Sequence, residues 1–131
     1  MVWTVKRWLI SMESQCSGRW AEQQALRQLE AQGWRLLDRN WRCRWGELDL
    51  VLIRHNALLV VEVKGRRPGS WDRHGLDAFH AAKRRRMARA ISCWRAAHPA
   101  SAEQLLRIKL ALVPLLPTRG TIGWIDVDRL C

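Results

Sequence analysis

Two short apolar runs, residues 47–53 and 57–64, constrain the fold of this chain most, because only Arg54, His55 and Asn56 separate them. Both runs are rich in Leu and Val, which favour strands, and the polar residues between them suit a tight turn. The segment is therefore predicted to be an antiparallel β-hairpin. If His55 and Asn56 form a two-residue turn, Arg54 faces the first residue of the second strand, which fixes the register of the hairpin.

The register of this hairpin brings charged side chains together. It sets Asp49 opposite Glu62, and Glu47 opposite Lys64. Because side chains alternate between the faces of a strand, these residues are expected on one face. The other face is predicted to be apolar, with Leu48, Leu50, Leu52, Leu59, Val61 and Val63.

Facing carboxylates about 5 Å apart repel, and each raises the pKa of the other unless a cation shares the space. Mg²⁺ and Mn²⁺ suit such a site, since Mg²⁺ accepts one or two protein carboxylates and completes its coordination with waters and phosphate oxygens. We therefore expect Asp49 and Glu62 to bind a metal ion and Lys64 to assist an attacking water. The alternative is an ordinary exposed ion pair, worth under about 1 kcal/mol.

Helix and strand patterns around the hairpin predict an α/β protein. Residues 18–32 are predicted to form a helix with Ala21, Ala25 and Leu29 on one stripe, and Glu22 is expected at the margin of that stripe. The remaining elements are predicted as a strand at 34–43, a loop at 65–75, a long helix at 76–97, a strand at 105–113, a turn at 114–120 and a last strand at 121–127.

The charge balance points to an anionic partner. The chain has 131 residues, enough for one domain, and its 23 Lys and Arg against 12 Asp and Glu give a net charge of +11. Such a field favours a polyanion, so nucleic acid is the first expectation, and an anionic membrane surface or an acidic protein is the second.

The cysteines and the first residues indicate where the protein works. Cys16, Cys43, Cys93 and Cys131 form no C-x-x-C pair, which suits free thiols in a reducing cytoplasm. The basic and apolar start is too short for an export signal or a membrane span. Residues 1–17 are expected to be a poorly ordered extension, and Met12 is an alternative start.

Basic and aromatic residues supply candidate nucleic-acid contacts. Lys83, Arg84, Arg85, Arg86 and Arg89 place more positive charge on the second helix than nearby acids neutralise. Lys83, Arg84, Arg86, Arg66 and Arg67 are the predicted phosphate contacts, and a solvated helix face is the alternative. Trp41, Trp45 and Trp71 lie among arginines and could stack on unpaired bases, although core packing is the commoner role of Trp.

A set of short motifs, spread from Gly18 to the last strand, forms a specific combination. The motifs are residues 18–25, Gly33, Asn40, residues 46–51, residues 61–66 and Lys83. Together they resemble the PD-(D/E)XK nuclease-like superfamily and, within it, the bacterial YraN family. The resemblance implies a single-domain restriction-endonuclease-like core over residues 18–131, with a mixed central sheet flanked by helices in the order α-β-β-β-α-β(-β). One departure is Arg107-Ile108-Lys109, where members of the YraN family often carry Arg-Phe-Asp.

The resemblance also implies roles for individual residues. Asp49 would be the metal-binding aspartate, Glu62 the second ligand, Lys64 the catalytic lysine and Glu22 the helix carboxylate of Holliday-junction-resolvase-like members. The implied activity is Mg²⁺- or Mn²⁺-dependent cleavage of DNA, branched or single-stranded, with DNA favoured over RNA. Resolvase-like relatives work as dimers, so the resemblance allows a homodimer.

A nuclease fold does not establish cleavage, so other functions stay open. The main alternative is a non-catalytic nucleic-acid-binding module that keeps the fold. A third reading is a basic scaffold that binds an acidic protein.

Overall fold

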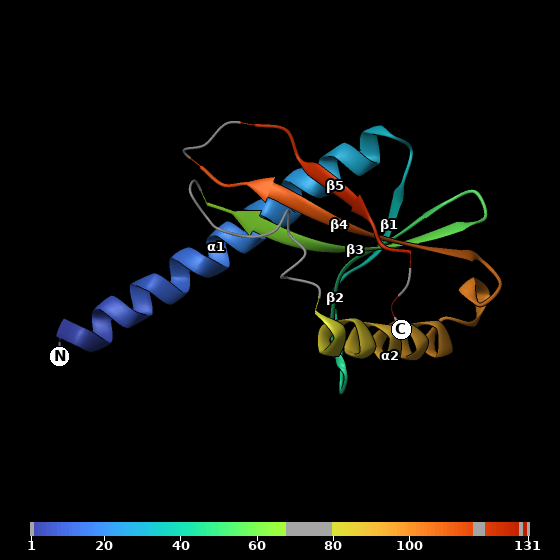
Figure 1. The fold of residues 1–131 in the computed structure, drawn as a ribbon, viewed down its shortest axis with the longest axis horizontal. Coiled ribbons are helices and arrows are strands. Elements are labelled where there is room, and N and C mark those ends of the chain that lie inside the picture. Colours follow the sequence, from blue (N-terminus) through green and yellow to red (C-terminus); the bar gives the residue numbers. More distant parts are fainter. Residues whose placement is uncertain (1, 68–79, 117–119, 129, 131) are drawn as a thin grey trace.

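The computed structural model describes residues 2–67, 80–116, 120–128 and 130, with side chains from Ser17 onward. Its elements follow the predicted order (Figure 1). They are α1 (Val2–Ala31), β1 (Arg35–Cys43), β2 (Gly46–Arg54), β3 (Ala57–Arg66), α2 (Ala81–Ala97), the 3₁₀ helix η2 (Pro99–Ser101), β4 (Leu105–Pro114) and β5 (Gly123–Asp126). The predicted single α/β domain with a mixed sheet is confirmed.

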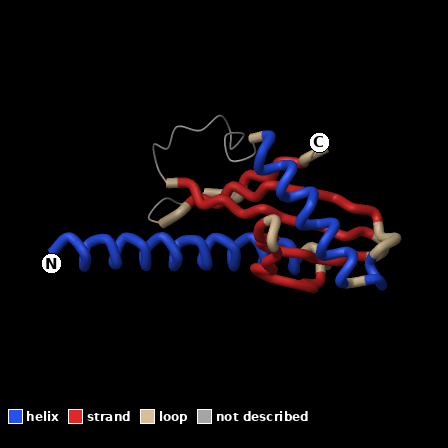
Figure 2. The backbone as a smooth tube through the Cα atoms, turned by 90° about the horizontal axis from the view of Figure 1, so that it is seen from below, coloured by secondary structure: helices blue, strands red, loops and turns tan. Residues whose placement is uncertain are grey.

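The five strands form one sheet in the order β1-β2-β3-β4-β5. Neighbouring strands are antiparallel except β3 and β4, which are parallel and are connected through α2. Parallel neighbours need such a crossover, and a helix is its usual form. The helices α1 and α2 lie on opposite faces of the sheet (Figure 2), which makes three layers.

Each helix buries one stripe against the sheet, so the core has two halves. On the α1 side, Ala21, Ala25 and Leu29 pack against a cluster that includes Leu50 and Val61. On the α2 side the cluster is formed by Met87, Ala90, Ile91 and Trp94 with Leu48, Val51, Leu58, Val60, Ile108 and Leu110. Residues 58–61 of β3 are no more than 1% exposed, as expected for a central strand covered on both faces.

The predicted hairpin register is confirmed where β2 and β3 pair. Arg54 faces Ala57, and the pairing continues to Leu50 opposite Val61. The turn is the predicted two-residue one, with His55 at a φ of 54°. A left-handed residue is usual in such hairpin turns, because its twist matches that of the strands.

The prediction that Leu48 shares a face with Leu50 is wrong. Leu48 packs in the α2 cluster, whereas Leu50 packs in the α1 cluster. Their partners on β1 are Trp41 and Arg39, and Asn40 between them has a φ of 51°. A left-handed residue interrupts the regular pleat of its strand, and the failure of alternation between Leu48 and Leu50 of β2 lies directly opposite this residue of β1.

Two boundaries differ most from the sequence predictions, those of the first helix and of the third strand. The first helix begins at Val2 instead of residue 18, although the division of the chain at residue 17 into extension and domain stays a prediction. Gly65 and Arg66 belong to β3 and not to the following loop. Residues 68–79, which hold most of that predicted loop and the predicted start of the second helix, lie outside the described residues. None of the helices described has a stretch long and apolar enough to cross a membrane.

Trp94 ties α2 to β1 in a way that a stability measurement can test. The ring is 1% exposed, and its Nε1 donates a hydrogen bond of 3.0 Å to Asp38 Oδ2. We expect Trp94→Phe to lower the free energy of unfolding by about 2 kcal/mol, because it removes a hydrogen bond to a charged group and some core volume. Urea denaturation measures this, with Trp124→Phe as control, since the Trp124 bond to Gln28 is exposed. Equal losses in the free energy of unfolding for Trp94→Phe and Trp124→Phe would contradict this role of Trp94.

Candidate active site

The strands β2 and β3 separate beyond the pair of Leu50 and Val61, and this opening is called the acidic fork. The two strands that separate there remain paired with their outer neighbours, β2 with β1 and β3 with β4. Asp49 and Glu62 are the first residues past the last pair, one on each arm. Asp49 Oδ2 accepts a hydrogen bond of 2.8 Å from the N–H of Val63, which links the arms. The fork therefore brings together the two predicted metal ligands.

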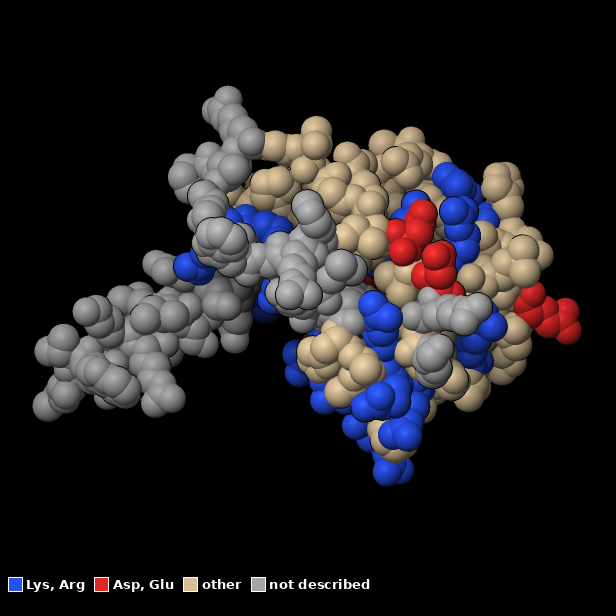
Figure 3. Space-filling view, viewed as in Figure 1, with Lys and Arg blue, Asp and Glu red and all other residues tan. Residues whose placement is uncertain are grey.

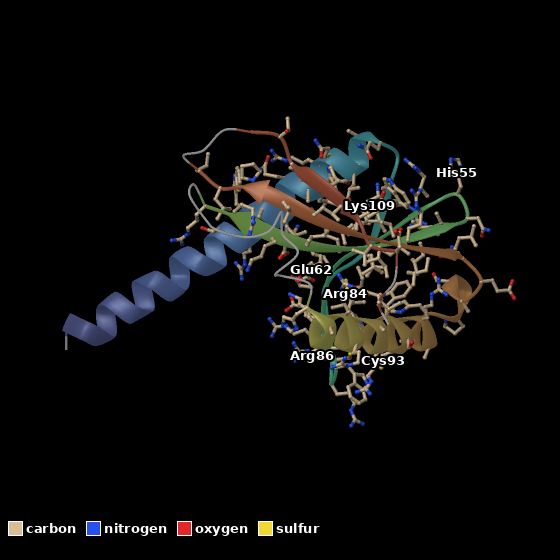
Figure 4. All side chains as sticks on the ribbon, viewed as in Figure 1. His55, Glu62, Arg84, Arg86, Cys93 and Lys109 are labelled. Atoms are coloured by element: carbon tan, nitrogen blue, oxygen red, sulfur yellow. The ribbon has the colours of Figure 1, made fainter. Side chains whose placement is uncertain are left out.

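A surface hollow opens at the acidic fork, between the sheet and the N-terminal end of α2. Figure 4 shows Glu62 and Arg86 near this end of the helix. This acidic hollow is lined by Trp45, Gly46, Glu47, Asp49, Glu62, Lys83, Arg86 and Met87. Lys83 Nζ lies 2.6 Å from Glu62 Oε1, so a lysine from α2 already provides a cation to one of the two carboxylates.

Burial and neighbouring acids change the protonation of Asp49. Burial, the charge of Glu62 and, to a smaller extent, the charges of Glu22 and Glu47 raise its pKa to about 8, against the opposing effect of the Val63 hydrogen bond. Near neutral pH the carboxyl therefore holds a proton for a large part of the time. A cation placed beside it would release that proton.

Glu22 contributes a further acid from α1. Burial raises its pKa, and the charges of Glu47 and Glu62 act in the same direction, while Asn40 and Arg39 oppose them. Its Oε2 is buried without a hydrogen-bond partner, and Arg39 Nε is 3.9 Å away. The left-handed Asn40 on β1 thus helps to hold Glu22.

The states of Glu22 and Asp49 indicate whether this group of acids suits a divalent cation. An unsatisfied buried carboxylate oxygen on Glu22 and a carboxyl on Asp49 that loses its charge are both signs of too few cations. Within the described part of the chain, no three His, Cys, Asp or Glu side chains form a ready ligand cluster. Mg²⁺ commonly binds only one or two carboxylates, so Asp49 and Glu62 fit Mg²⁺ or Mn²⁺.

Lys64, the predicted catalytic lysine, lines a different hollow from the two carboxylates. Its side chain is exposed and lines a second hollow, here the basic hollow. That hollow is lined by Ser17, Gly18, Val63, Lys64, Gly65, Arg66, Arg67 and Leu115. Among the described residues, Lys83 makes an ion pair with Glu62 and Lys64 does not.

The other predicted basic contacts line one or the other hollow, except Arg84. Arg86 lines the acidic hollow, and Arg66 and Arg67 line the basic hollow. Arg84 is half-buried on α2, and its Nε has no hydrogen-bond partner. Figure 3 shows Lys and Arg side chains covering the part of the molecule around α2. The structure thus places a basic surface directly beside the acidic fork.

Three features of the site were not predicted from the sequence. One is the ion pair between Lys83 and Glu62, and another is the contact of Asn40 with Glu22. The third is Trp45 in the wall of the acidic hollow. The sequence held one signal for this, because Trp45 stands two residues before Glu47. Where the sequence departs from the YraN pattern, Lys109 lies on β4, and its Nζ is 3.7 Å from Asp126 Oδ1.

A mixed five-stranded sheet with one helix on each face defines this protein as a single-domain α/β protein, and two of its acids lie where two strands of that sheet separate. The chain belongs to the uncharacterised protein family UPF0102, whose sequence model matches residues 21–113 and which corresponds to the nuclease-like YraN family. The predicted resemblance is therefore confirmed.

Relatives of similar length support this membership. A UPF0102 protein of Synechococcus sp. strain CC9902 is 54% identical over 90% of this chain and 98% of its own length. Another, from Parasynechococcus marenigrum strain WH8102, is 52% identical over 93% of this chain and 89% of its own length. A more distant relative from Stutzerimonas stutzeri strain A1501 is 36% identical over 86% and 93% of the two chains. The similarity thus covers nearly the whole domain.

Proposed function

We propose that this protein is a metal-dependent nuclease that cleaves phosphodiester bonds of nucleic acid, in the cytoplasm and with DNA favoured over RNA. The observation that carries the proposal is the acidic fork, where Asp49 and Glu62 meet from separate strands inside a chain of net charge +11. Facing acids weaken the fold unless a cation neutralises them, and a basic surface attracts a polyanion to the same place. Both properties suit a site that binds a metal ion and a phosphate together.

Asp49 and Glu62 would hold Mg²⁺ or Mn²⁺, with Glu22 as an additional acid. When bound, the cation would supply charge neutralisation at the phosphodiester and activation of a water molecule. Lys83 would have to release Glu62, and its freed ammonium group would then be available for a phosphate oxygen. A catalytic role for Lys64 requires its side chain to turn from the basic hollow toward the fork, which lies two residues away on β3.

Cleavage assays with matched variants test this proposal. Wild-type protein is incubated with single-stranded, duplex and four-way-junction DNA in Mn²⁺, beside Asp49→Ala, Glu62→Gln and Lys64→Ala. We expect cutting to fall by about 100-fold or more in the first two variants, because they remove ligands of the metal ion. Asp126→Asn, on the exposed side of the Lys109 pair, should cut like wild type. Equal cutting by all proteins, or none by any, overturns the proposal.

A second candidate function, a non-catalytic nucleic-acid-binding module, is favoured by one observation. Lys83 already neutralises Glu62 at 2.6 Å, and such an internal cation can replace a metal ion. This function predicts salt-sensitive DNA binding that persists in Asp49→Ala and does not change with Mn²⁺. Calorimetric titration of Mn²⁺ into the wild-type protein distinguishes the two functions, because only the nuclease should bind the ion at the fork.

A further inference from the structure

Trp45 lies in the turn between β1 and β2, with two arginines over its ring. The Arg44 guanidinium carbon is 4.7 Å from the ring centroid, and that of Arg89, from α2, is 4.5 Å from it. Trp45 is half-buried and packs against the α2 cluster. Both arginines are exposed. The turn and the helix therefore present guanidinium groups supported by one aromatic ring.

Among the described residues, neither of these two guanidinium groups is paired with an acid. In the part of the chain that the structure describes, Arg44 and Arg89 form no ion pair, although Glu47 lies in the same hairpin and pairs with Arg42 at 3.5 Å. Their positive charge thus remains available to an external anion. An arginine held by cation–π contact also loses less conformational freedom when it binds a ligand.

This group of three residues adjoins the acidic fork through Trp45. Trp45 itself lines the acidic hollow, together with Asp49 and Glu62. A second arginine of α2, Arg86, lines the same hollow. A nucleic-acid strand with one phosphate at the fork would therefore have its adjacent nucleotide beside Trp45.

The chemistry of the group selects one form of nucleic acid. Guanidinium planes and indole rings stack on the flat faces of bases, and their N–H groups donate to phosphate oxygens. Inside a continuous duplex, the base faces are covered by neighbouring base pairs. Only unpaired or terminal bases expose them. A surface for duplex DNA needs phosphate contacts but no stacking group.

We propose that Arg44, Trp45 and Arg89 form a stacking platform for an unpaired base beside the acidic fork. The substrate class is then nucleic acid with single-stranded nucleotides next to the bond at the fork, such as an overhang, a flap or a gap. The proposal rests on the proposed function for the identity of the fork. Binding of an unpaired base by this platform does not require cleavage.

Binding measurements in EDTA test the platform separately from the nuclease activity. Fluorescence anisotropy is measured with a labelled single-stranded oligonucleotide and with a hairpin duplex of equal charge. We expect Arg44→Gln combined with Arg89→Gln to weaken single-strand binding by about tenfold or more, and duplex binding by clearly less, since stacking contributes to only one of them. Arg54→Gln is the matched control, because Arg54 stacks on Trp34 at 4.4 Å, away from the acidic hollow. It should change neither affinity by more than about twofold.

Two variants of the tryptophan separate stacking from folding. Trp45→Phe keeps an aromatic ring and should keep most of the single-strand preference. Trp45→Leu should lose that preference, although its melting temperature should be similar to that of Trp45→Phe. Photo-crosslinking with an oligonucleotide that contains 5-iododeoxyuridine should label Trp45 or its neighbours in the turn. Equal losses for single strand and duplex, or no loss for either, overturn the platform. If the wild-type protein prefers single strands but shows no metal-dependent cutting, this result counts against the proposed function and leaves the platform standing.

Discussion

The Asp49→Asn variant is expected to be more stable than the wild-type protein at pH 8 in metal-free buffer, and equally stable near pH 4. A folded-state pKa of about 8, against an ordinary value of 3.8, means that the wild-type carboxyl favours folding only while it is protonated. Its contribution is complete below pH 4 and is lost as the pH rises through 8. Asparagine removes this loss and keeps an oxygen to accept the N–H of Val63.

The expected gain is on the order of 3 kcal/mol at pH 8, or roughly 10 °C in melting temperature. Thermal melts between pH 4 and 9 in EDTA measure it. Asp126→Asn is the control, because Asp126 is exposed and should change stability by less than about 0.5 kcal/mol at each pH. Added Mn²⁺ should reduce the difference by stabilising the wild type alone. A difference that stays constant with pH would contradict the raised pKa.

Lys83→Met is expected to have the second large effect, because it removes the ammonium group 2.6 Å from Glu62 while keeping a long side chain. The metal-free variant should lose about 2 kcal/mol of stability, since Glu62 then lies among uncompensated acids. Its affinity for Mn²⁺ should rise about tenfold, because the ion no longer competes with the lysine. Thermal melts and calorimetric titration measure the two effects.

Arg85→Met is the matched control for this variant. Arg85 is an exposed residue of the same helix and lies outside the acidic hollow. It should lower nucleic-acid affinity slightly and leave the Mn²⁺ response unchanged. Weaker Mn²⁺ binding by Lys83→Met would show that Lys83 supports the ion instead of replacing it.

The hairpin and the acid pair were predictable from local sequence. Tight turn residues between two Leu- and Val-rich runs fixed the register, and Arg54 does face Ala57. That register brought Asp49 and Glu62 to the same end of β2 and β3. Their separation there was not predictable, because it depends on the pairing of β2 with β1 and of β3 with β4. The pairing of β3 with β4 is long-range, and neither pairing leaves a mark in the residues of the hairpin formed by β2 and β3.

The departure at Leu48 has a local cause. Alternation assumes a regular pleat, which the left-handed Asn40 interrupts opposite the site. It therefore assigned Leu48 to the wrong side of the sheet. The approach of Lys83 to Glu62 depends on how α2 docks on the sheet. Side-chain periodicity shows which stripe of a helix is buried, but not which strand end its first turn reaches.

The hydrogen bond from Val63 to Asp49 has a consequence for spectroscopy. It joins the arms of the fork through one backbone amide, at 2.8 Å from a carboxyl that titrates near pH 8. The ¹⁵N–¹H resonance of Val63 should therefore move with the protonation of Asp49 and move again when a cation binds. In a uniformly labelled sample, this one signal would report the chemical state of the site without any substrate.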